Sequence, residues 1–312
     1  MTEISSRPWT GPDDLRAIEG LLTAAWNGPG RPLVPVTVGD LEWWLALGGP
    51  DVDWSRRIRI WESGGEIVGW GWFKPPIEAE WFVSAAAAVA LADRVRDEIL
   101  AWHAALAREA LAETPPSSDG PTPRLEKWAA DGWPEATFLA DRGWTAGDLL
   151  LTQFFQPLDL ELDPLRVPDG YSLRTMRGPG DIPARVEVHR AAFAPSQLTR
   201  EKYELAVGQE HYAFERDVVV EAPDGSFAAF ALCWLDPAAA LGYFEPVGVH
   251  PDHQRRGLGR VVMRHGLRLL RAAGARDAMV FSFRTNTASE ALYRSAGFDE
   301  VAIHRIWTKP AG

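Results

Sequence analysis

Hydrophobic and polar residues alternate in two stretches of the chain that each surround a glycine-containing turn. Residues 57–73, RIRIWESGGEIVGWGWF, predict two strands joined at Gly64-Gly65. Residues 217–235, DVVVEAPDGSFAAFALCWL, predict two strands joined at Asp224-Gly225. Aligned on their turns, the two predicted hairpins coincide without a gap, so the chain contains this pattern twice.

Other landmarks recur in the same order in both halves. A Gly-Pro turn with acidic residues precedes a helical pattern, and in the first half Asp13 or Asp14 is expected to cap that helix. Later, FLADRGW resembles LYRSAGF, and each precedes a final apolar strand. In the first and second halves these landmarks lie at 11–14 and 178–181, at 138–144 and 292–298, and at 149–155 and 301–307. Four matched landmarks, counting the hairpin, indicate an internal duplication.

The segment 156–169, QPLDLELDPLRVPD, contains three prolines and several acidic residues without clear periodicity. Such a composition is typical of a linker. We therefore predict two domains, residues 1–157 and residues 168–312. The total length of 312 residues suits this division, since a domain commonly has about 150 residues.

Composition limits the classes of function. A net charge of −11 argues against a surface that follows nucleic-acid phosphates, so no nucleic-acid partner is expected. No apolar run approaches the roughly 20 residues that span a bilayer, and the first residues lack the pattern of an export signal. We therefore expect a cytoplasmic protein without a membrane partner. The single cysteine, Cys233, forms no internal disulfide and is expected to be a buried, inert thiol.

The predicted strand 242–249 carries an unusual proline. Pro246 has no N–H to donate, so we expect this strand to part from a neighbour near Glu245. The N–H and C=O groups of Val247 and Val249 would then be available to an extended ligand with amide groups.

The glycine-rich loop 254–260, QRRGLGR, follows this strand and precedes a predicted helix over 260–273. Glycines let backbone N–H groups converge on an anion, and the helix presents its positive end at the same place. Together with Arg255, Arg256 and Arg260, these features favour a pyrophosphate site. The loop is neither a P-loop nor a dinucleotide fingerprint. By its composition alone, it could also be a glycine turn with exposed arginines at a helix start.

Residues 247–260, VGVHPDHQRRGLGR, resemble the acyl-CoA-binding motif of the GNAT superfamily of N-acetyltransferases, with Gln254, Gly257 and Gly259 in its pattern. Residues 281–298, FSFRTNTASEALYRSAGF, resemble the second motif of that superfamily. The resemblance covers 168–312, while in the first half only the architecture carries over. The tandem arrangement is similar to that of the mycothiol synthase family. This resemblance implies an α/β (α+β) fold of two tandem GNAT domains, each a mixed, mostly antiparallel sheet flanked by helices.

The same resemblance implies an enzyme that transfers acetyl from acetyl-CoA to a small-molecule amine, directly within a ternary complex and without a metal. Glu245 is the candidate base, acting through water, although a partly exposed strand carboxylate is the alternative. Tyr293 is the candidate proton donor to the leaving thiolate, with helix packing as its alternative. Two other readings stay open, namely a non-catalytic acyl-CoA sensor and a protein or peptide acetyltransferase.

Further residues follow from the motif. Val247 is a candidate N–H donor to the thioester oxyanion, and Asn286 is expected to bond the pantetheine arm, cap its helix, or both. His250 and His253 are interpreted as turn residues. The residues expected to bind acetyl-CoA are Val247, Gly248, Val249, Gln254, Arg255, Arg256, Gly257, Leu258, Gly259, Arg260 and Asn286.

The first half is predicted to lack a cofactor site. Aligning Val83 with Val249 places Ala88, Leu91 and Asp93 at the positions of Gln254, Gly257 and Gly259. The alanines there are expected to continue a helix, and an aspartate would repel pyrophosphate. Leu139 stands opposite Tyr293. The predicted role of this half is to shape the substrate pocket, with Glu78 and Glu80 as possible contacts.

Overall fold

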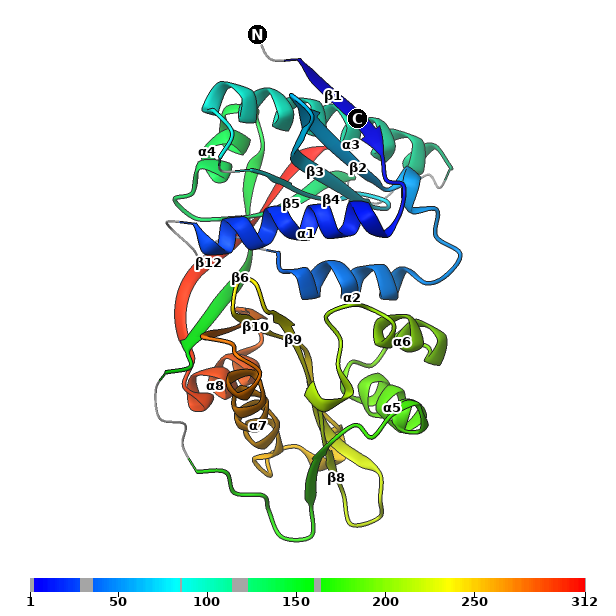
Figure 1. Ribbon diagram of the computed structural model, residues 1–312, viewed down its shortest axis with the longest axis vertical. Coiled ribbons are helices and arrows are strands. Elements are labelled where there is room, and N and C mark those ends of the chain that lie inside the picture. Colours follow the sequence, from blue (N-terminus) through cyan, green and yellow to red (C-terminus); the bar gives the residue numbers. More distant parts are fainter. Residues whose placement is uncertain (1–2, 29–35, 85, 114–122, 160–163, 312) are drawn as a thin grey trace. The chain divides into compact units, whose positions relative to one another are not determined.

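The computed structural model describes residues 3–28, 36–84, 86–113, 123–159 and 164–311 (Figure 1). By internal contacts the chain forms two compact units. Unit 1 consists of Met1–Pro35, Asp53–Leu151 and Ala302–Gly312. Unit 2 consists of Val36–Val52 and Thr152–Val301. Among the described residues, no helix combines the length and apolar character that a membrane span requires.

Unit 1 contains a sheet of mostly antiparallel strands in the order β1-β2-β3-β4-β5-β12, in which only β4 and β5 run parallel. Its strands are β1 (Ile4–Pro8), β2 (Ile58–Ser63), β3 (Glu66–Lys74), β4 (Glu78–Val83), β5 (Arg124–Ala130) and most of β12 (Asp299–Pro310). Its helices are α1 (Pro12–Asn27), the short η1 (Trp54–Arg56), α3 (Val89–Glu113) and α4 (Pro134–Asp141). The first half of β6 (Thr145–Pro157) also belongs to it.

The sheet strands of unit 2 follow in the order β6-β11-β10-β9-β8-β7, with β10 and β11 parallel. Besides the second half of β6, its strands are β7 (Ser172–Thr175), β8 (Asp217–Glu221), β9 (Phe227–Asp236), β10 (Leu241–Val249) and β11 (Asp277–Phe283). Its helices are α2 (Val38–Gly48), α5 (Ile182–Ala192), α6 (Arg200–Val207), α7 (Leu258–Ala272) and α8 (Thr287–Ala296). Short turns η2 (Pro179–Asp181), η3 (Phe214–Arg216) and η4 (Pro251–His253) connect them.

Both predicted hairpins are confirmed. Strands β2 and β3 pair antiparallel around Gly64 and Gly65, whose φ angles of 64° and 85° lie in the left-handed region that favours glycine. Strands β8 and β9 pair antiparallel around a turn that contains Gly225, with φ 85°. The fold class is confirmed as well, since each unit is a mixed, mostly antiparallel sheet with flanking helices.

Strand β9 is the centre of the unit 2 core, because all ten of its residues are buried. Residues that alternate along β9, including Cys233, pack with the apolar face of α7, and Phe230 on the other face lies beneath the α5 residue Arg185. Helices therefore cover both faces of this strand, which explains its nearly continuous apolar sequence. Cys233 is fully buried, as expected, and burial raises the pKa of its thiol.

Two local predictions for the first half are wrong. Helix α1 begins after Gly11, no side chain caps it, and Asp14 instead accepts hydrogen bonds from Arg7 and Thr10. The alanines near Ala88 do not continue a helix, since α3 begins only at Val89. The connection from β4 to α3, residues 84–88, contains no glycine, whereas residues 254–260 contain two.

The compact units are discontinuous in sequence, whereas the predicted domains 1–157 and 168–312 are continuous. Helix α2 packs with α6 and with strands β9 and β10, and so belongs to unit 2 although it lies early in the chain. The residues from Ala302 onward belong to unit 1, where β12 pairs with β5. That residues 1–157 and residues 168–312 fold as independent domains stays a prediction.

Candidate functional site

Strand β10 parts from its parallel neighbour close to the expected position. Its ladder with β11 ends at Tyr243↔Met279, and its register with β9 shifts between Phe244 and Val247. Glu245 and Pro246 occupy this irregularity. A Cβ on Gly248 would lie 2.5 Å from the Phe230 ring and 3.0 Å from Ala192, so only glycine fits there. Because the ladder between β10 and β11 ends at Tyr243, β11 forms no backbone pairing with β10 over Val247–Val249.

Glu245 lies at the point where β10 bends. Its side chain is partly buried, and burial together with the nearby Asp40 carboxylate raises its pKa to about 8. Trp234 fixes the backbone here by donating from Nε1 to the Glu245 carbonyl oxygen at 2.7 Å. A carboxyl group with this pKa is ionised above about pH 8 and can then accept a proton from an attacking group.

Asp40 reaches this region from helix α2 of unit 2, and the sequence analysis missed it. Asp40 completes a capping box with Thr37, whose hydroxyl accepts from the Asp40 N–H at 3.1 Å while the Asp40 carboxylate accepts from the Thr37 N–H at 2.7 Å. Gly39 allows close packing, since a Cβ there would lie 2.5 Å from Trp234. The pattern Thr37-Val38-Gly39-Asp40 was a readable helix start, but nothing local indicated what this helix packs on.

Burial and Asp40 also raise the pKa of Tyr243, which lies on β10 together with Glu245. Burial raises the pKa of the Tyr243 hydroxyl well above its usual value, and its hydrogen bond to Asp40 and the nearby Glu245 act in the same direction. Within the described part of unit 2, the buried Asp40 and Tyr243 and the partly buried Glu245 therefore form an acidic cluster, and no cation contributes to the pKa of Glu245. Such a cluster favours the binding of a positively charged group.

Tyr293 lies on α8 and is 6% exposed, with its ring edge-on to Phe154 at 5.7 Å between centroids. Burial and the charge of Glu245 raise the pKa of its hydroxyl, so it stays protonated at neutral pH. Helix α8 is fixed at its start by Asn286, whose side chain accepts from the Ser289 N–H at 3.1 Å. This confirms the capping role of Asn286. The Thr152 hydroxyl also donates to Glu290 of α8 at 2.6 Å.

The glycine loop leads directly into α7. Gly257 is the residue that precedes the helix, with φ 80° in the left-handed region, and no side chain caps the first turn. A Cβ on Gly259 would lie 3.0 Å from Leu292. Leu258 points into the core, so only its backbone is available to a ligand. The backbone N–H groups at this helix start form a cradle of the kind that binds phosphates.

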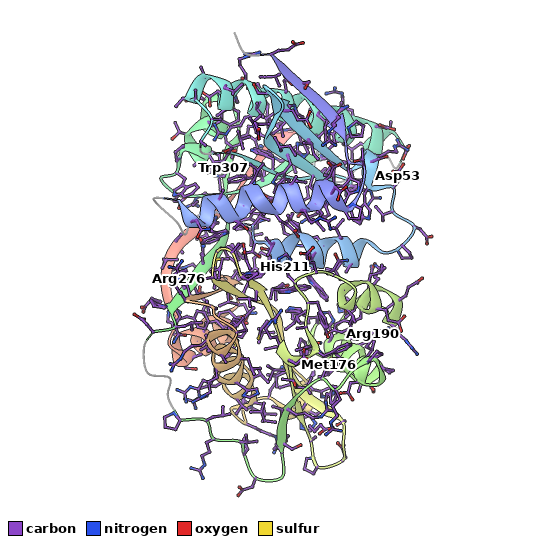
Figure 2. The ribbon with its side chains drawn as sticks, in the orientation of Figure 1. Asp53, Met176, Arg190, His211, Arg276 and Trp307 are labelled. Atoms are coloured by element: carbon purple, nitrogen blue, oxygen red, sulfur yellow. The ribbon has the colours of Figure 1, made fainter. Side chains whose placement is uncertain are left out.

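The structure brings the predicted loop residues together at one end of α7. Gln254, Arg255, Arg256 and Arg260 are exposed there. The histidines of the preceding turn have local partners, as expected: His250 accepts from the Asp252 N–H, and His253 contacts the Tyr171 hydroxyl at 2.9 Å. Neither histidine is part of the acidic cluster. Another histidine, His211 (Figure 2), lies 2.9 Å from the buried Glu42 of α2, measured from Nδ1 to Oε1.

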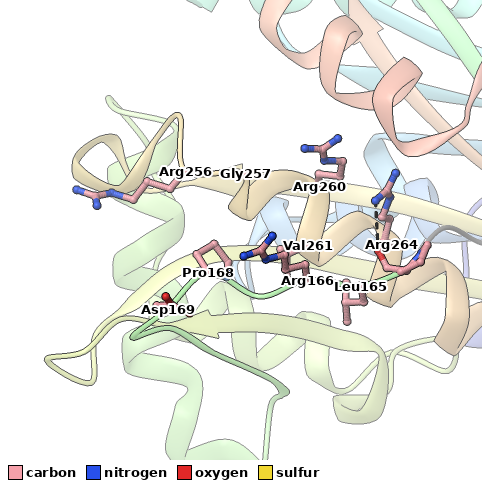
Figure 3. Close-up of a pocket in the computed structure, with 10 residues that line it drawn as sticks. Leu165, Arg166, Pro168, Asp169, Arg256, Gly257, Arg260, Val261 and Arg264 are labelled. Atoms are coloured by element: carbon pink, nitrogen blue, oxygen red, sulfur yellow. Dashed lines mark hydrogen bonds between the residues drawn. The ribbon is translucent and has the colours of Figure 1, made fainter.

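A cavity of about 430 Å³ lies beside this helix start (Figure 3). Four arginines line it, two of which, Arg166 and Arg264, the sequence analysis missed. The lining residues are Pro164, Leu165, Arg166, Pro168, Asp169, Arg256, Gly257, Arg260, Val261 and Arg264. Arg264 follows Arg260 by four residues on α7, which was a usable signal. Arg166 lies in the segment that we interpreted only as a linker.

Coenzyme A fits the donor groups of this end of unit 2. The uncapped helix start and the arginines supply N–H groups and positive charge for a diphosphate. The unpaired edge of β10 suits an extended arm with amide groups. In unit 1, the sequence after β4 has no glycine in residues 84–93, Asp93 accepts a hydrogen bond from Arg96 at 3.1 Å, and Leu139 is fully buried.

Comparisons with known proteins agree with this geometry. Residues 185–298 match the model of the acetyltransferase (GNAT) family. The chain is 30% identical over 255 residues to the mycothiol acetyltransferase of Saccharopolyspora erythraea, covering 80% of this chain and 84% of that protein. It is 31% identical over 291 residues to the mycothiol acetyltransferase of Nocardia farcinica, covering 90% and 89%.

Two solved structures share the fold of the whole chain. A GCN5-related N-acetyltransferase from Sphaerobacter thermophilus matches with a TM-score of 0.68 and 16% identity, over 99% of this chain and 96% of that one. A tandem GNAT protein from the clavulanic acid biosynthesis pathway matches with a TM-score of 0.66 and 18% identity, over 99% of both chains. The family uses acetyl-CoA as its donor, and the alternative of a non-catalytic acyl-CoA sensor is set aside. This chain belongs to the GNAT family of acetyltransferases, as an acyltransferase with tandem GNAT architecture.

Proposed function

We propose that this enzyme transfers the acetyl group of acetyl-CoA to the amine of a small molecule, directly within a ternary complex. The observation that carries this proposal is Glu245, a carboxyl group whose pKa is raised to about 8 at the point where β10 parts from β11. In this mechanism Glu245 takes the proton of the attacking amine, through water.

The reaction needs three further contributions from unit 2. The Val247 N–H donates to the oxyanion that forms when the amine attacks the thioester carbon. The C–S bond then breaks, and Tyr293 donates its proton to the leaving thiolate. Its raised pKa supports this role, because the hydroxyl keeps its proton until a strong base forms beside it. The loop residues from Gln254 to Arg260, with Asn286, hold the donor. No step requires a metal.

The acidic cluster supports an amine as acceptor. An ammonium group that enters beside Asp40 and Glu245 relieves the repulsion between the two carboxylates and lowers the pKa of Glu245, which prepares it to act as a base. The names of the mycothiol acetyltransferase relatives support a small acceptor rather than a protein. We therefore propose that a peptide or protein amine is not the natural acceptor.

A thiol-release assay with acetyl-CoA tests this proposal. The panel contains amino sugars such as the amine precursor of mycothiol, along with polyamines, aminoglycosides and free amino acids. We expect one small amine to release thiol at least about tenfold faster than the others, since the site selects its acceptor by several contacts. Mass spectrometry of peptides incubated with acetyl-CoA serves as the opposing arm. Rapid peptide acetylation without turnover of any small amine would contradict the proposal.

A further inference from the structure

We infer that the arginine-lined cavity beside Gly257 receives the adenosine end of coenzyme A, and that Arg166 and Arg264 recognise its 3′-phosphate. This inference rests on the proposed donor site and adds a specificity to it. The enzyme should distinguish coenzyme A from dephospho-coenzyme A, which differs only in lacking that phosphomonoester.

The position of the cavity supports this assignment. It begins at Gly257, where the helix start offers its N–H groups, and continues along one face of α7 through Arg260, Val261 and Arg264. These residues follow at intervals of three and four, so they share that face, and the rise of a helix places Arg264 about 10 Å beyond Gly257. A ligand whose diphosphate lies at Gly257 therefore has its next group beside Arg264. The volume of about 430 Å³ is within the range of small-ligand sites.

The charge of the cavity exceeds what a diphosphate needs. Four arginines face one carboxylate, that of Asp169, in a chain whose net charge is −11. Within the described chain, Arg166, Arg256 and Arg260 form no ion pair with a carboxylate. Like charges gathered in this way repel each other until an anion binds between them. The loop N–H groups, Arg256 and Arg260 suffice for a diphosphate, which leaves Arg166 and Arg264 for a second phosphate group.

The linker residues that the structure describes from Pro164 to Asp169 form one wall of the cavity. Leu165 and Val167 pack against the unit 2 core, and the intervening Arg166 is exposed and points toward α7 (Figure 3). The Arg264 guanidinium donates to the carbonyl oxygens of Pro164 and Ser295, each at 3.4 Å, and is thereby held in place.

Just after the linker, the Tyr171 hydroxyl contacts His253 in the turn before the glycine loop. Residues 164–171 are therefore attached to α7 at one end and to the turn before the donor loop at the other. Guanidinium groups bind phosphate with two parallel hydrogen bonds, and holding them in position beforehand reduces the entropy cost of that contact.

Calorimetric titration with coenzyme A and with dephospho-coenzyme A tests the inference without any need for turnover. We expect the wild-type protein to bind coenzyme A about tenfold or more tightly than dephospho-coenzyme A, since a charge-assisted contact contributes on this scale. Arg166→Ala should weaken binding of coenzyme A and leave binding of dephospho-coenzyme A unchanged, so that the preference shrinks. Arg264→Ala should act in the same direction.

Arg177→Ala is the matched control. Arg177 belongs to unit 2, its side chain is 72% exposed, and it lies outside the cavity. Its loss removes the same charge and should leave the preference intact. Equal affinity of the wild-type protein for the two ligands would overturn the inference alone, as would an equal loss for both ligands in Arg166→Ala. Failure to bind either ligand would overturn the proposed donor site as well.

Discussion

The two units each contain a pair of parallel strands that part after a short ladder. A glutamate lies near each parting point, with a cation beside it in unit 1 and another carboxylate nearby in unit 2. In unit 1, β4 and β5 pair only at Glu78↔Glu126. In unit 2, β10 and β11 pair as far as Tyr243↔Met279. The strand architecture is therefore shared, and the difference between the two units lies in the side chains.

The strand registers show which side chains correspond. On the β3–β4 hairpin, Phe73↔Ala79 and Gly71↔Trp81 leave one residue between them on β4, which is Glu80. On the β9–β10 hairpin, the equivalent steps Cys233↔Phe244 and Ala231↔Val247 leave two residues, Glu245 and Pro246. Glu80 therefore stands where unit 2 has Glu245 and an added proline. On the second strand of each parallel pair, the residue after the last paired residue is Lys127, after Glu126 of β5, and Val280, after Met279 of β11. These two positions therefore correspond.

The environments of the two carboxylates differ accordingly. Glu80 is 4% exposed and forms an ion pair with the equally buried Lys127, whose ammonium also lies 4.9 Å from the Trp81 ring centre. Glu245 has the carboxylate of Asp40 nearby instead, and apolar Val280 at the position of the lysine. One strand end therefore carries a paired carboxylate, and the other carries a carboxylate with a raised pKa, which suits the proposed proton transfer. Glu80 is therefore unsuited to the substrate contact that its sequence position suggested.

Replacing the proposed base should have the largest effect. Glu245→Gln is expected to lower kcat about 10²- to 10⁴-fold with little change in the Kd of acetyl-CoA, because an amide cannot accept the proton. In the wild type kcat/KM, which reports the free enzyme, should fall as the pH drops below about 8, and this dependence should be lost in the variant. Stopped-time thiol release across pH, with calorimetry for the donor, measures both. Glu80→Gln, the counterpart, should leave kcat of the folded enzyme unchanged.

The same variant has a stability readout. The folded-state pKa of Glu245 is raised above its ordinary value, so the folded protein loses stability as the pH rises from about 4.5 to about 8 and the carboxyl ionises. Glu245→Gln should therefore raise the Tm more at pH 9 than at pH 5. A Tm change that is the same at both pH values would contradict the raised pKa.

Removing the cation of unit 1 should be the next largest change. Lys127→Met leaves Glu80 buried and unpaired, and we expect a loss of about 3–5 kcal/mol in the free energy of unfolding. Replacing both residues, with Glu80→Leu added to Lys127→Met, should restore most of that stability. Chemical denaturation measures the effect. Equal stability of the single and double variants would show that the pair does not balance a buried charge.

Replacing the proposed proton donor should have a smaller effect than replacing the base. Tyr293→Phe keeps the buried ring and its contact with Phe154, and it is expected to lower kcat about 10²-fold at an unchanged Tm. The thiolate of coenzyme A is a stable leaving group without protonation, so activity should not vanish. A donor whose leaving thiol is more acidic should reduce the difference between variant and wild type. A loss of Tm without a loss of kcat would assign Tyr293 to packing alone.

The comparison also shows what the sequence could supply. The hairpins and the glycine loop follow from local patterns of alternation and glycine, and the structure contains both. The roles of Glu245 and Tyr293 came from the resemblance to the GNAT motifs and stay predictions. Asp40 and Lys127 were missed because each interacts with a residue far away in the chain, and Arg166 was missed because it shares its cavity with residues of the distant helix α7. Asp40 belongs to a helix whose packing partner depends on the fold, and Lys127 looked like one residue of an ordinary strand. Pairings of this kind arise only when distant strands and helices come together.

Asp40 provides the smallest and most specific test of the comparison. It is the charged neighbour of Glu245, as Lys127 is the charged neighbour of Glu80 in unit 1, but its charge has the opposite sign. Asp40→Asn keeps an acceptor for the Thr37 N–H but removes the charge that raises the pKa of Glu245. The acid limb of the rate profile should then move to lower pH, and the KM for the amine should rise because one of two carboxylates is lost. Thr37→Ala, which breaks the same capping box at a cost of about 1 kcal/mol, is the control and should leave the pH profile in place. A profile that moves equally in both variants would show that Asp40 acts by holding α2 rather than by its charge.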